Sequence, residues 1–297
     1  MLSILIPVYN CIVVSLVEDL STQCRIEEID FEIIVCDDVS REVFQKKNIV
    51  IRNSSNVIYE ELDSRKGRSG IRNHMAKLAK YENLLFLDGD SGIEQSYINR
   101  YVNVISGSYE IVYGGRKYPN ECPDPKKILH FKYGHKVESK EASIRMRKPW
   151  ITFMSNNFLI KRTLFETIGF SENIKGYGYE DLIFAGECKK NNYSIHHIDN
   201  KVIHIGLDDA TEFLAKTKEA ISNLYRLIPE YKILNEVKLV RFATILQFLF
   251  ISRPFILCTW MLENKLKKNI LGKKPLILSL QWYKLYLYLT EKGKTSL

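Results

Sequence analysis

The chain has 297 residues, 45% of them hydrophobic and 26% charged, so it can bury a core and form one large domain, or a domain with an appendage. Its net charge of +8 is concentrated at one end: residues 232–297 hold twelve basic and three acidic side chains, whereas residues 1–231 hold 31 and 32. A body with this balance is not expected to bind nucleic acid.

The six cysteines show no paired spacing and several lie in apolar segments, a pattern typical of reduced thiols in a cytoplasmic protein. Residues 2–8 form an apolar run that predicts a strand and not a signal peptide. No uninterrupted apolar stretch reaches the roughly 18 residues expected of a membrane-spanning helix. We therefore expect a cytoplasmic protein.

Short apolar runs alternate with helical patterns in the first part of the chain. The runs that predict strands are 2–8, 31–36, 57–59, 84–87 and 110–113. Residues 69–80 give the clearest helix, with Ser69 as a cap and Ile71, Met75 and Leu78 spaced along one face. This alternation predicts an α/β fold with a mostly parallel sheet covered on both faces, where ligands bind at the carboxyl ends of strands.

The second part of the body begins with a polar segment, residues 116–150, whose prolines and many basic side chains predict a long mobile loop, with a short helix as an alternative for part of it. A strand is expected at 155–161 and a helix at 180–191. Two strands at 193–198 and 202–205 and a charged helix at 209–227 follow. We expect a body of residues 1–231, made of the segments 1–115, 116–150 and 151–231.

Two carboxylates, Asp88 and Asp90, directly follow the run that ends at Leu87. In extended backbone, residues i and i+2 point to the same side, so both can approach one cation, and Gly89 lets the backbone come close to a ligand. Hard cations such as Mg²⁺ or Mn²⁺ take oxygen ligands and share them with substrate phosphates. An ordinary Asp/Gly turn is the alternative interpretation.

Five segments, taken in order, resemble glycosyltransferase family 2, the inverting sugar transferases with the GT-A fold. They are 3–10, 32–40, 72–73, 85–90 and 176–181. The resemblance covers about residues 1–206. It implies a Rossmann-like, mostly parallel sheet flanked by helices, in which residues 1–115 bind a nucleotide sugar and residues 151–231 bind the acceptor.

The resemblance also implies which residues bind the donor. These are Pro7, Tyr9, Asp38, Arg68, Arg72, Asp88 and Gly89. Tyr9 would stack on a uracil-like ring and Asp38 would accept a hydrogen bond from the base. Arg72, near a helix amino end, suits a diphosphate.

Asp88 and Asp90 would hold Mn²⁺ or Mg²⁺ on that diphosphate. Ser91 stands where family members often carry a further acid, so His204 is the expected distant third ligand, by similarity to GT-A enzymes that recruit a late histidine.

On the acceptor side, the resemblance assigns the general base to Asp181, with Glu180 orienting donor or acceptor, although these two roles could be exchanged. Gly178 precedes them in the matching motif. A sugar pocket is expected to include Trp150, Asn156 and Asn157.

Residues 232–297 combine apolar runs, a lysine cluster and several tyrosines. This pattern predicts amphipathic helices that lie in a membrane surface, or else a helical appendage that packs on protein.

Together these features predict a metal-dependent inverting glycosyltransferase. It would use a UDP-linked sugar and a glycan or lipid-linked glycan acceptor, as in bacterial surface-polysaccharide synthesis, and act peripherally on the inner face of the cell membrane. A non-catalytic nucleotide- or glycan-binding subunit is one alternative. A sugar-phosphate nucleotidyltransferase is a weaker one, since the glycine-rich basic signature it needs after the first strand is missing.

Overall fold

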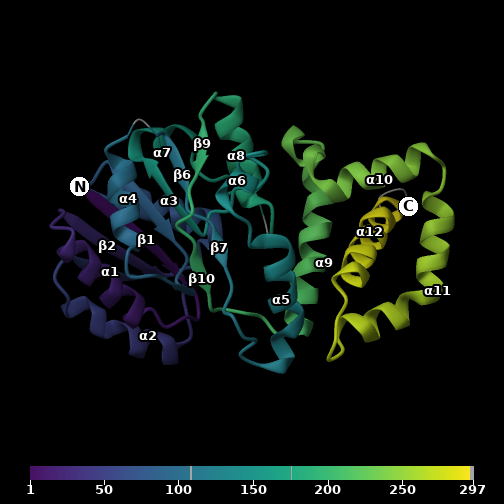
Figure 1. Ribbon diagram of the computed structural model, residues 1–297, viewed down its shortest axis with the longest axis horizontal. Coiled ribbons are helices and arrows are strands. Elements are labelled where there is room, and N and C mark those ends of the chain that lie inside the picture. The colour runs from purple at the N-terminus through teal and green to yellow at the C-terminus, as the bar shows by residue number, and fades with distance from the viewer. Residues whose placement is uncertain (108, 175, 295–297) are drawn as a thin grey trace. The chain divides into compact units, whose positions relative to one another are not determined.

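The computed structural model describes residues 1–107, 109–174 and 176–294 (Figure 1). The chain divides into two compact units. The first consists of Met1–Lys117, Ser139–Ile174 and Glu187–Gly206, and the second of Tyr118–Glu138, Lys175–Gly186 and Leu207–Leu297. This division differs from the predicted boundary at residue 231, because the second unit also takes in part of the predicted loop and the segment that carries Glu180 and Asp181.

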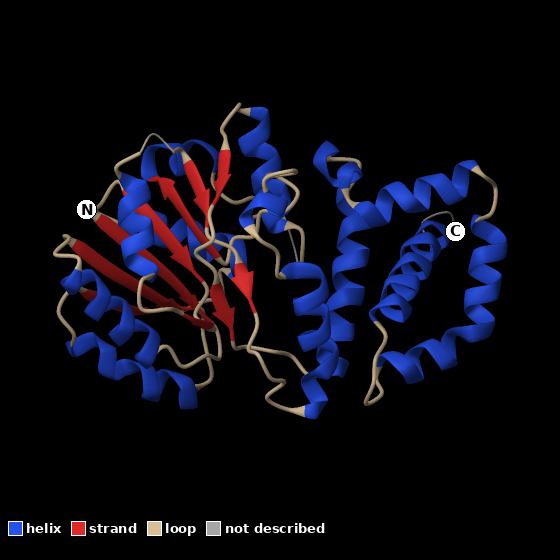
Figure 2. Ribbon diagram, in the orientation of Figure 1, coloured by secondary structure: helices blue, strands red, loops and turns tan. Residues whose placement is uncertain are grey.

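A seven-stranded sheet forms the centre of the first unit, with the order β3-β2-β1-β4-β8-β6-β9 (Figure 2). Its strands are β1 (Leu2–Val8), β2 (Phe31–Asp37), β3 (Val57–Glu61), β4 (Asn83–Leu87), β6 (Ile111–Tyr113), β8 (Asn157–Lys161) and β9 (Ile195–His197). The first four are parallel to one another, β8 runs antiparallel between β4 and β6, and β9 is parallel to β6. The sheet is therefore mostly parallel, as the fold class requires.

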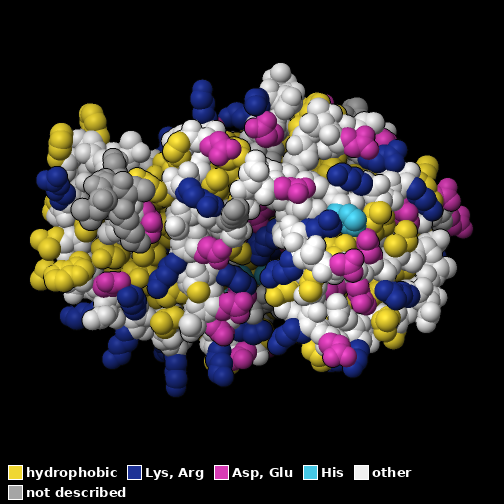
Figure 3. All heavy atoms as spheres, turned by 180° about the vertical axis from the view of Figure 1, so that it is seen from behind, with side chains coloured by type: hydrophobic (Ala, Val, Ile, Leu, Met, Phe, Trp, Pro, Cys, Tyr) yellow, Lys and Arg dark blue, Asp and Glu magenta, His cyan; other side chains and the backbone are white. Residues whose placement is uncertain are grey.

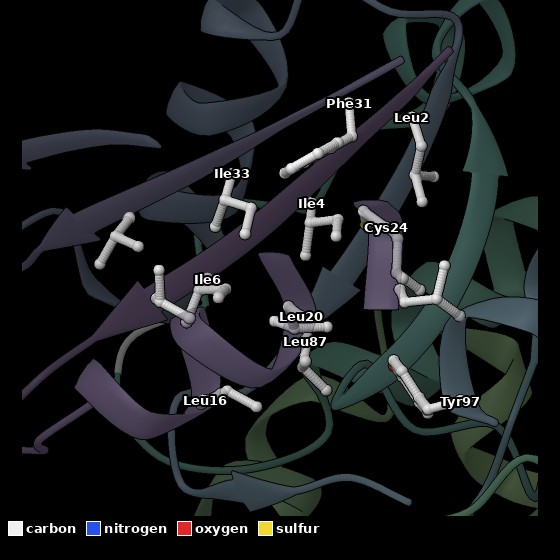
Figure 4. Close-up of a cluster of buried hydrophobic side chains, with 14 of the residues drawn as sticks. Leu2, Ile4, Ile6, Leu16, Leu20, Cys24, Phe31, Ile33, Leu87 and Tyr97 are labelled. Carbon is white, nitrogen blue, oxygen red and sulfur yellow. The ribbon is translucent and has the colours of Figure 1, made fainter. Parts of the chain in front are cut away.

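The strands of this sheet are buried on both sides, because helices cover both of its faces. On one face, Leu2, Ile4 and Ile6 of β1 join α1 (Val14–Ile26) and α4 (Tyr97–Ile105) in one apolar cluster (Figure 4). On the other, Phe86 stacks on Phe165 of α7 (Arg162–Ile168), and α3 (Gly67–Leu78) packs beside α7. The short helices α2 (Glu42–Asn48) and η1 (Ile49–Asn53) connect β2 to β3.

A second sheet has three short strands in the order β5-β10-β7: β5 (Ser91–Gly92), β10 (Val202–His204) and β7 (Arg116–Lys117). Its register pairs His204 with Ser91, directly after Asp90. This small sheet thus brings two distant segments of the chain, β7 and β10, to the residues that follow β4.

Residues 116–150 are not the loop that the sequence predicts. They contain β7, η2 (Pro125–Lys127), α5 (Ile128–Tyr133), a π-helical turn, η3 (Gly134–Glu138), and α6 (Ala142–Arg145). Arg145, one of the basic residues of this segment, is 2% exposed and donates hydrogen bonds to four backbone carbonyls, those of Lys140, Tyr113, Gly114 and Ile198. The prediction failed because a buried guanidinium with these partners fixes the segment.

The second unit is helical. Besides α5 and the start of α8 (Glu180–Lys190), it contains α9 (Ala210–Leu227), η4 (Lys232–Glu236), α10 (Lys238–Phe248), α11 (Ser252–Ile270) and α12 (Ile277–Lys294). Asp209 caps the amino end of α9, because its carboxylate accepts hydrogen bonds from the backbone N–H groups of Thr211 and Glu212. An apolar cluster joins α5, α9, α11 and α12 through residues such as Leu129, Phe213, Ile270 and Leu280. The predicted helical appendage is confirmed.

Candidate active site

The ends of three neighbouring strands place the predicted donor residues close together. Tyr9 follows β1, Asp38 follows β2 and Asp88 follows β4, and these strands are adjacent in the sheet. The Asp38 backbone N–H donates to the Val8 carbonyl across 2.8 Å. At Gly89, an added Cβ would lie 3.0 Å from Val13 and 3.3 Å from the carbonyl oxygen of Pro7, so only a glycine lets these strand ends approach without a shift.

Both carboxylate oxygens of Asp38 accept backbone hydrogen bonds at the start of α3. The donors are the N–H groups of Lys66, at 2.6 Å, and Gly67, at 3.0 Å. Asp38 therefore fixes the amino end of the helix that carries Arg68 and Arg72. Its contact with a nucleotide base remains a prediction.

Tyr9 is 48% exposed, so its ring is accessible. The guanidinium of Arg65 lies 3.9 Å from the centre of that ring and covers one face. A base that stacks on Tyr9, as predicted, would use the other face or displace Arg65.

Two guanidinium groups hold Asp88. Arg72 Nη2 lies 2.6 Å from one carboxylate oxygen and Arg116 Nη2 lies 3.6 Å from the other. Arg72 is also positioned by a 3.0 Å hydrogen bond from Nη1 to the Arg68 carbonyl. Such paired guanidiniums suit a diphosphate as well as a carboxylate.

Arg116 is not among the predicted site residues. The available signal was its position, since it follows Gly114 and Gly115 directly after a strand. Gly115 has φ of 98°, and a Cβ on Gly114 would lie 2.5 Å from the side-chain amide of Asn157. Those two glycines turn the chain so that Arg116 joins the small sheet beside Asp88.

Asp90 meets His204, as the prediction of a late histidine requires. His204 Nδ1 is 3.4 Å from Asp90 Oδ2, and the Ile205 N–H donates to the Asp90 carbonyl across 2.9 Å. Burial alone would raise the pKa of Asp90, but the hydrogen bond and charge of His204, with Arg116 and Arg68, lower it to about 2. Asp90 is therefore ionised at neutral pH.

The donor set of this site fits a hard divalent cation in chemistry, since it offers two carboxylates and an imidazole. Asp90 and His204 are in place, whereas Asp88 is turned toward the two arginines. Among the described residues, the three possible metal ligands whose atoms lie within 4.8 Å of one another are not these but Cys36, Glu60 and His74. A cation on all three predicted ligands would thus require Asp88 to leave Arg72.

Asn156 and Asn157 have opposite roles. Neither amide atom of Asn156, 3% exposed, has a hydrogen-bond partner among the described residues, although its carbonyl accepts the Asp88 N–H at 3.0 Å. The amide of Asn157, fully buried, accepts from Tyr97 and Tyr101 and donates to the Gly115 and Asn200 carbonyls. The amide of Asn157 is therefore fully used in the core, which gives no support to its predicted contact with a sugar.

Trp150 packs beside the chain that enters β9. Its Nε1 donates to the Tyr193 carbonyl across 3.4 Å, and the ammonium of Lys189 lies 5.3 Å from its ring. Two strands separate β9 from β4 in the sheet. These contacts give no support to a sugar-stacking role for Trp150.

Glu180 and Asp181 occupy the first turn of α8, in the second unit. The glycine-rich turn before them packs on α9: a Cβ on Gly178, where φ is 99°, would lie 2.9 Å from Ala220, and the Tyr177 N–H donates to Glu219. Glu180 is buried and Asp181 is half-buried. The turn is thus fixed within its unit, and its predicted role toward an acceptor stays a prediction.

Comparisons with known proteins agree with this fold. The family model described as "Glycosyl transferase family 2" matches residues 3–169. A comparison with curated protein sequences finds no match.

Solved structures similar to the chain include S. aureus TarS, with a TM-score of 0.53 and 20% identity over 99% of this chain and 91% of that one. The same protein in complex with UDP gives 0.54 and 18%, over the same shares of the two chains. The mannosyltransferase PcManGT from Pyrobaculum calidifontis, in complex with GDP-Man and Mn²⁺, gives 0.61 and 13% over 99% and 86%. At these identities the likeness shows the fold, which is GT-A. The family match covers more than half of the sequence, and the chain belongs to glycosyl transferase family 2.

Proposed function

We propose that this protein is a metal-dependent inverting glycosyltransferase that moves a sugar from a UDP-linked donor to a hydroxyl group of a glycan or lipid-linked glycan. Membership of family 2 supports glycosyl transfer. Among the similar structures, TarS is in complex with UDP and with UDP-GlcNAc, and the mannosyltransferase is in complex with GDP-Man and Mn²⁺. These ligands support a nucleotide-sugar donor.

The observation that carries the proposal is the grouping of charges after β4. Asp88 lies between Arg72 and Arg116, and the ionised Asp90 lies beside His204. A nucleoside diphosphate needs both cationic donors and a metal site, and this grouping offers both at the carboxyl end of β4.

In this scheme Arg72 and Arg116 would bind the diphosphate through their guanidinium forks, and Asp88, once released from them, would be a ligand for the cation. Asp90 and His204 complete the set of residues that would hold Mn²⁺ or Mg²⁺. When bound, the cation would offset the negative charge that grows on the leaving nucleoside diphosphate. Asp38 keeps α3, and with it Arg72, at the strand ends.

Transfer with inversion needs a single displacement. The acceptor oxygen forms the new bond to the anomeric carbon while the bond to the diphosphate oxygen breaks and its electron pair leaves with UDP. Asp181 would take the proton of the acceptor hydroxyl, with Glu180 beside it as the alternative base. General-base assistance contributes on the order of 10²–10⁴ in rate.

The first test is the release of UDP or GDP from a panel of nucleotide sugars with Mn²⁺, with water as acceptor. We expect metal-stimulated release from a UDP-sugar, reduced at least tenfold by Asp90→Asn. Asp19→Asn, an exposed carboxylate on α1, serves as control and should stay within twofold of the wild type. If a nucleotide sugar binds but none is cleaved, the catalytic proposal fails and the non-catalytic subunit is favoured; if none binds, the proposed donor is wrong as well.

The second test separates the base from the donor site. Asp181→Asn should keep UDP binding within about twofold, measured by calorimetry, and lower cleavage by on the order of 10²–10⁴. Glu187→Gln, on the same helix, is the matched control. Loss of UDP binding in Asp181→Asn would place Asp181 with the donor instead.

A further inference from the structure

The corner between α10 and α11 exposes an unusual number of large apolar side chains. We call this set the apolar corner. It consists of Phe242, Ile245, Phe248, Leu249, Phe250, Ile251, Leu257, Trp260, Met261 and Leu262, and each member is between 42% and 89% exposed. Arg253 is the single charged residue within 242–262. Soluble proteins rarely expose an apolar patch of more than a few hundred Å², so a surface of this kind indicates a partner.

Packing inside the second unit does not account for these side chains. The inner face of α10 already buries Val240, Ala243 and Leu246. Phe242, Ile245 and Phe248 lie on its other face, so the helix is apolar on both sides. A helix that is apolar all round is normally covered all round. In Figure 3, hydrophobic side chains gather on the side of the molecule formed by the C-terminal helices.

The tip of the corner carries a backbone feature that folding alone would not favour. Phe250 has φ of 58°, in the left-handed region, and its side chain is 89% exposed. A bulky residue is strained there, and glycine or asparagine would fit more easily. A phenyl group held outward at this position gains nothing from water, but it would gain from an apolar medium.

The charges around the corner are basic. Exposed cations precede, interrupt and follow it: Arg241, Arg253, Lys265, Lys268, Lys273 and Lys274. Glu263, the acid next to it, is paired with Lys267 at 2.7 Å. An apolar surface bordered by basic side chains, with a tryptophan among them, matches the interface of an anionic lipid membrane.

We propose that the apolar corner inserts into one leaflet of an anionic membrane, with Phe248 and Phe250 deepest and the basic residues at the headgroups. Among the described helices, none is by itself long and apolar enough to cross a membrane, whereas α10 and α11 pass that test as a pair bent by 115°. Insertion into one leaflet fits this bend, and at that depth the long side chain of Arg253 can reach the headgroups. The proposal does not depend on the reaction proposed above.

The test measures sedimentation of the full chain with vesicles of phosphatidylcholine and phosphatidylglycerol (7:3). We expect Phe248→Ser with Phe250→Gly to lower the partition coefficient at least tenfold. The control is Ile26→Ser with Val50→Ser, two exposed apolar residues of the first unit, which should stay within twofold of the wild type. Because glycine suits the backbone of Phe250, the single variant Phe250→Gly should bind vesicles more weakly while its thermal midpoint stays equal or rises.

The charge component is tested separately. Replacing Arg253, Lys265 and Lys268 with glutamine should reduce binding to the anionic vesicles at least fivefold and leave binding to pure phosphatidylcholine unchanged within twofold. Equal sedimentation of the wild type and of Phe248→Ser with Phe250→Gly would overturn the proposal. It would also be overturned by a chain that ignores vesicles but forms a dimer in light scattering that the same double variant dissociates, since the corner would then bind a second copy.

Discussion

The carboxylate of Asp90 can occupy its position because the residue next to it in space, Gly206, has no side chain. A Cβ on Gly206 would lie 2.1 Å from Asp90 Oδ2, a distance at which the carboxylate must move. Gly206→Ala should therefore raise the Mn²⁺ concentration needed for half-maximal donor cleavage, and for Mn²⁺-dependent thermal stabilisation by UDP, at least tenfold.

Gly92→Ala is the matched control in the same small sheet. Its Cβ would meet Ile203 at an ordinary 3.6 Å, so we expect a change within twofold. A normal Mn²⁺ response in Gly206→Ala would mean that the Asp90 carboxylate does not bind the cation.

His197 gives the stability of the first unit a pH dependence. Burial, and then the adjacent Arg145 guanidinium, lower its pKa from 6.5 to about 4. Between these values the unfolded chain binds a proton that the folded chain does not, so stability falls as the pH drops through that window. From pH 7 to pH 4.5 the wild type should lose about 2 kcal/mol more than His197→Gln.

Urea unfolding across that pH range measures this difference. His196→Gln serves as control, because His196 points to the opposite side of β9 and is half-exposed. Parallel pH profiles for the wild type and His197→Gln would contradict the assignment of the proton to His197.

At the scale of elements, Asn157 connects β8 to α4 and to the loops at Gly115 and Asn200. Its amide takes part in four hydrogen bonds, all in the core. Asn157→Ala would leave two tyrosine hydroxyls and two carbonyls without these partners, and should lower the free energy of unfolding by about 2–4 kcal/mol.

Its neighbour should behave differently. Asn156→Ala should cost less than about 1 kcal/mol in unfolding, because no hydrogen bond of its amide within the described structure is lost, and should raise the KM for the donor. Thermal unfolding and steady-state kinetics on the two variants check the pair. A large loss of stability in Asn156→Ala with an unchanged KM would remove Asn156 from the site.

Elements with a clear local pattern could be predicted from the sequence. Strand β1 is matched residue for residue, and the helix expected at 69–80 is α3, displaced by two residues. The direction of β8 could not be read, because its apolar run suits either direction and its antiparallel pairing with β4 depends on the long connection before it. The pairing of the small sheet could not be predicted either, because its strands have only two or three residues each.

At the scale of the whole molecule, the residues of the candidate site could also be predicted only where the local sequence pattern is clear. Asp88 and Asp90 could be predicted because they lie close in sequence after a strong strand. Arg145 could not, since a basic residue in a polar segment has the same local pattern whether it is solvated or buried, and the signal for Arg116 was limited to the two glycines before it. The apolar and basic character of the segment that forms the apolar corner could be predicted from the sequence. The exposure of Phe250 could not, because it depends on the turn between α10 and α11.

The most direct test of the account is a crystal of the protein soaked with Mn²⁺ and UDP, measured at a wavelength where manganese scatters anomalously. We predict one strong peak at about 2.2 Å from an Asp90 oxygen, with His204 and a diphosphate oxygen beside it and Asp88 turned away from Arg72. A peak at Cys36, Glu60 and His74 with none at Asp90, or UDP bound away from the ends of β1, β2 and β4, would contradict the account.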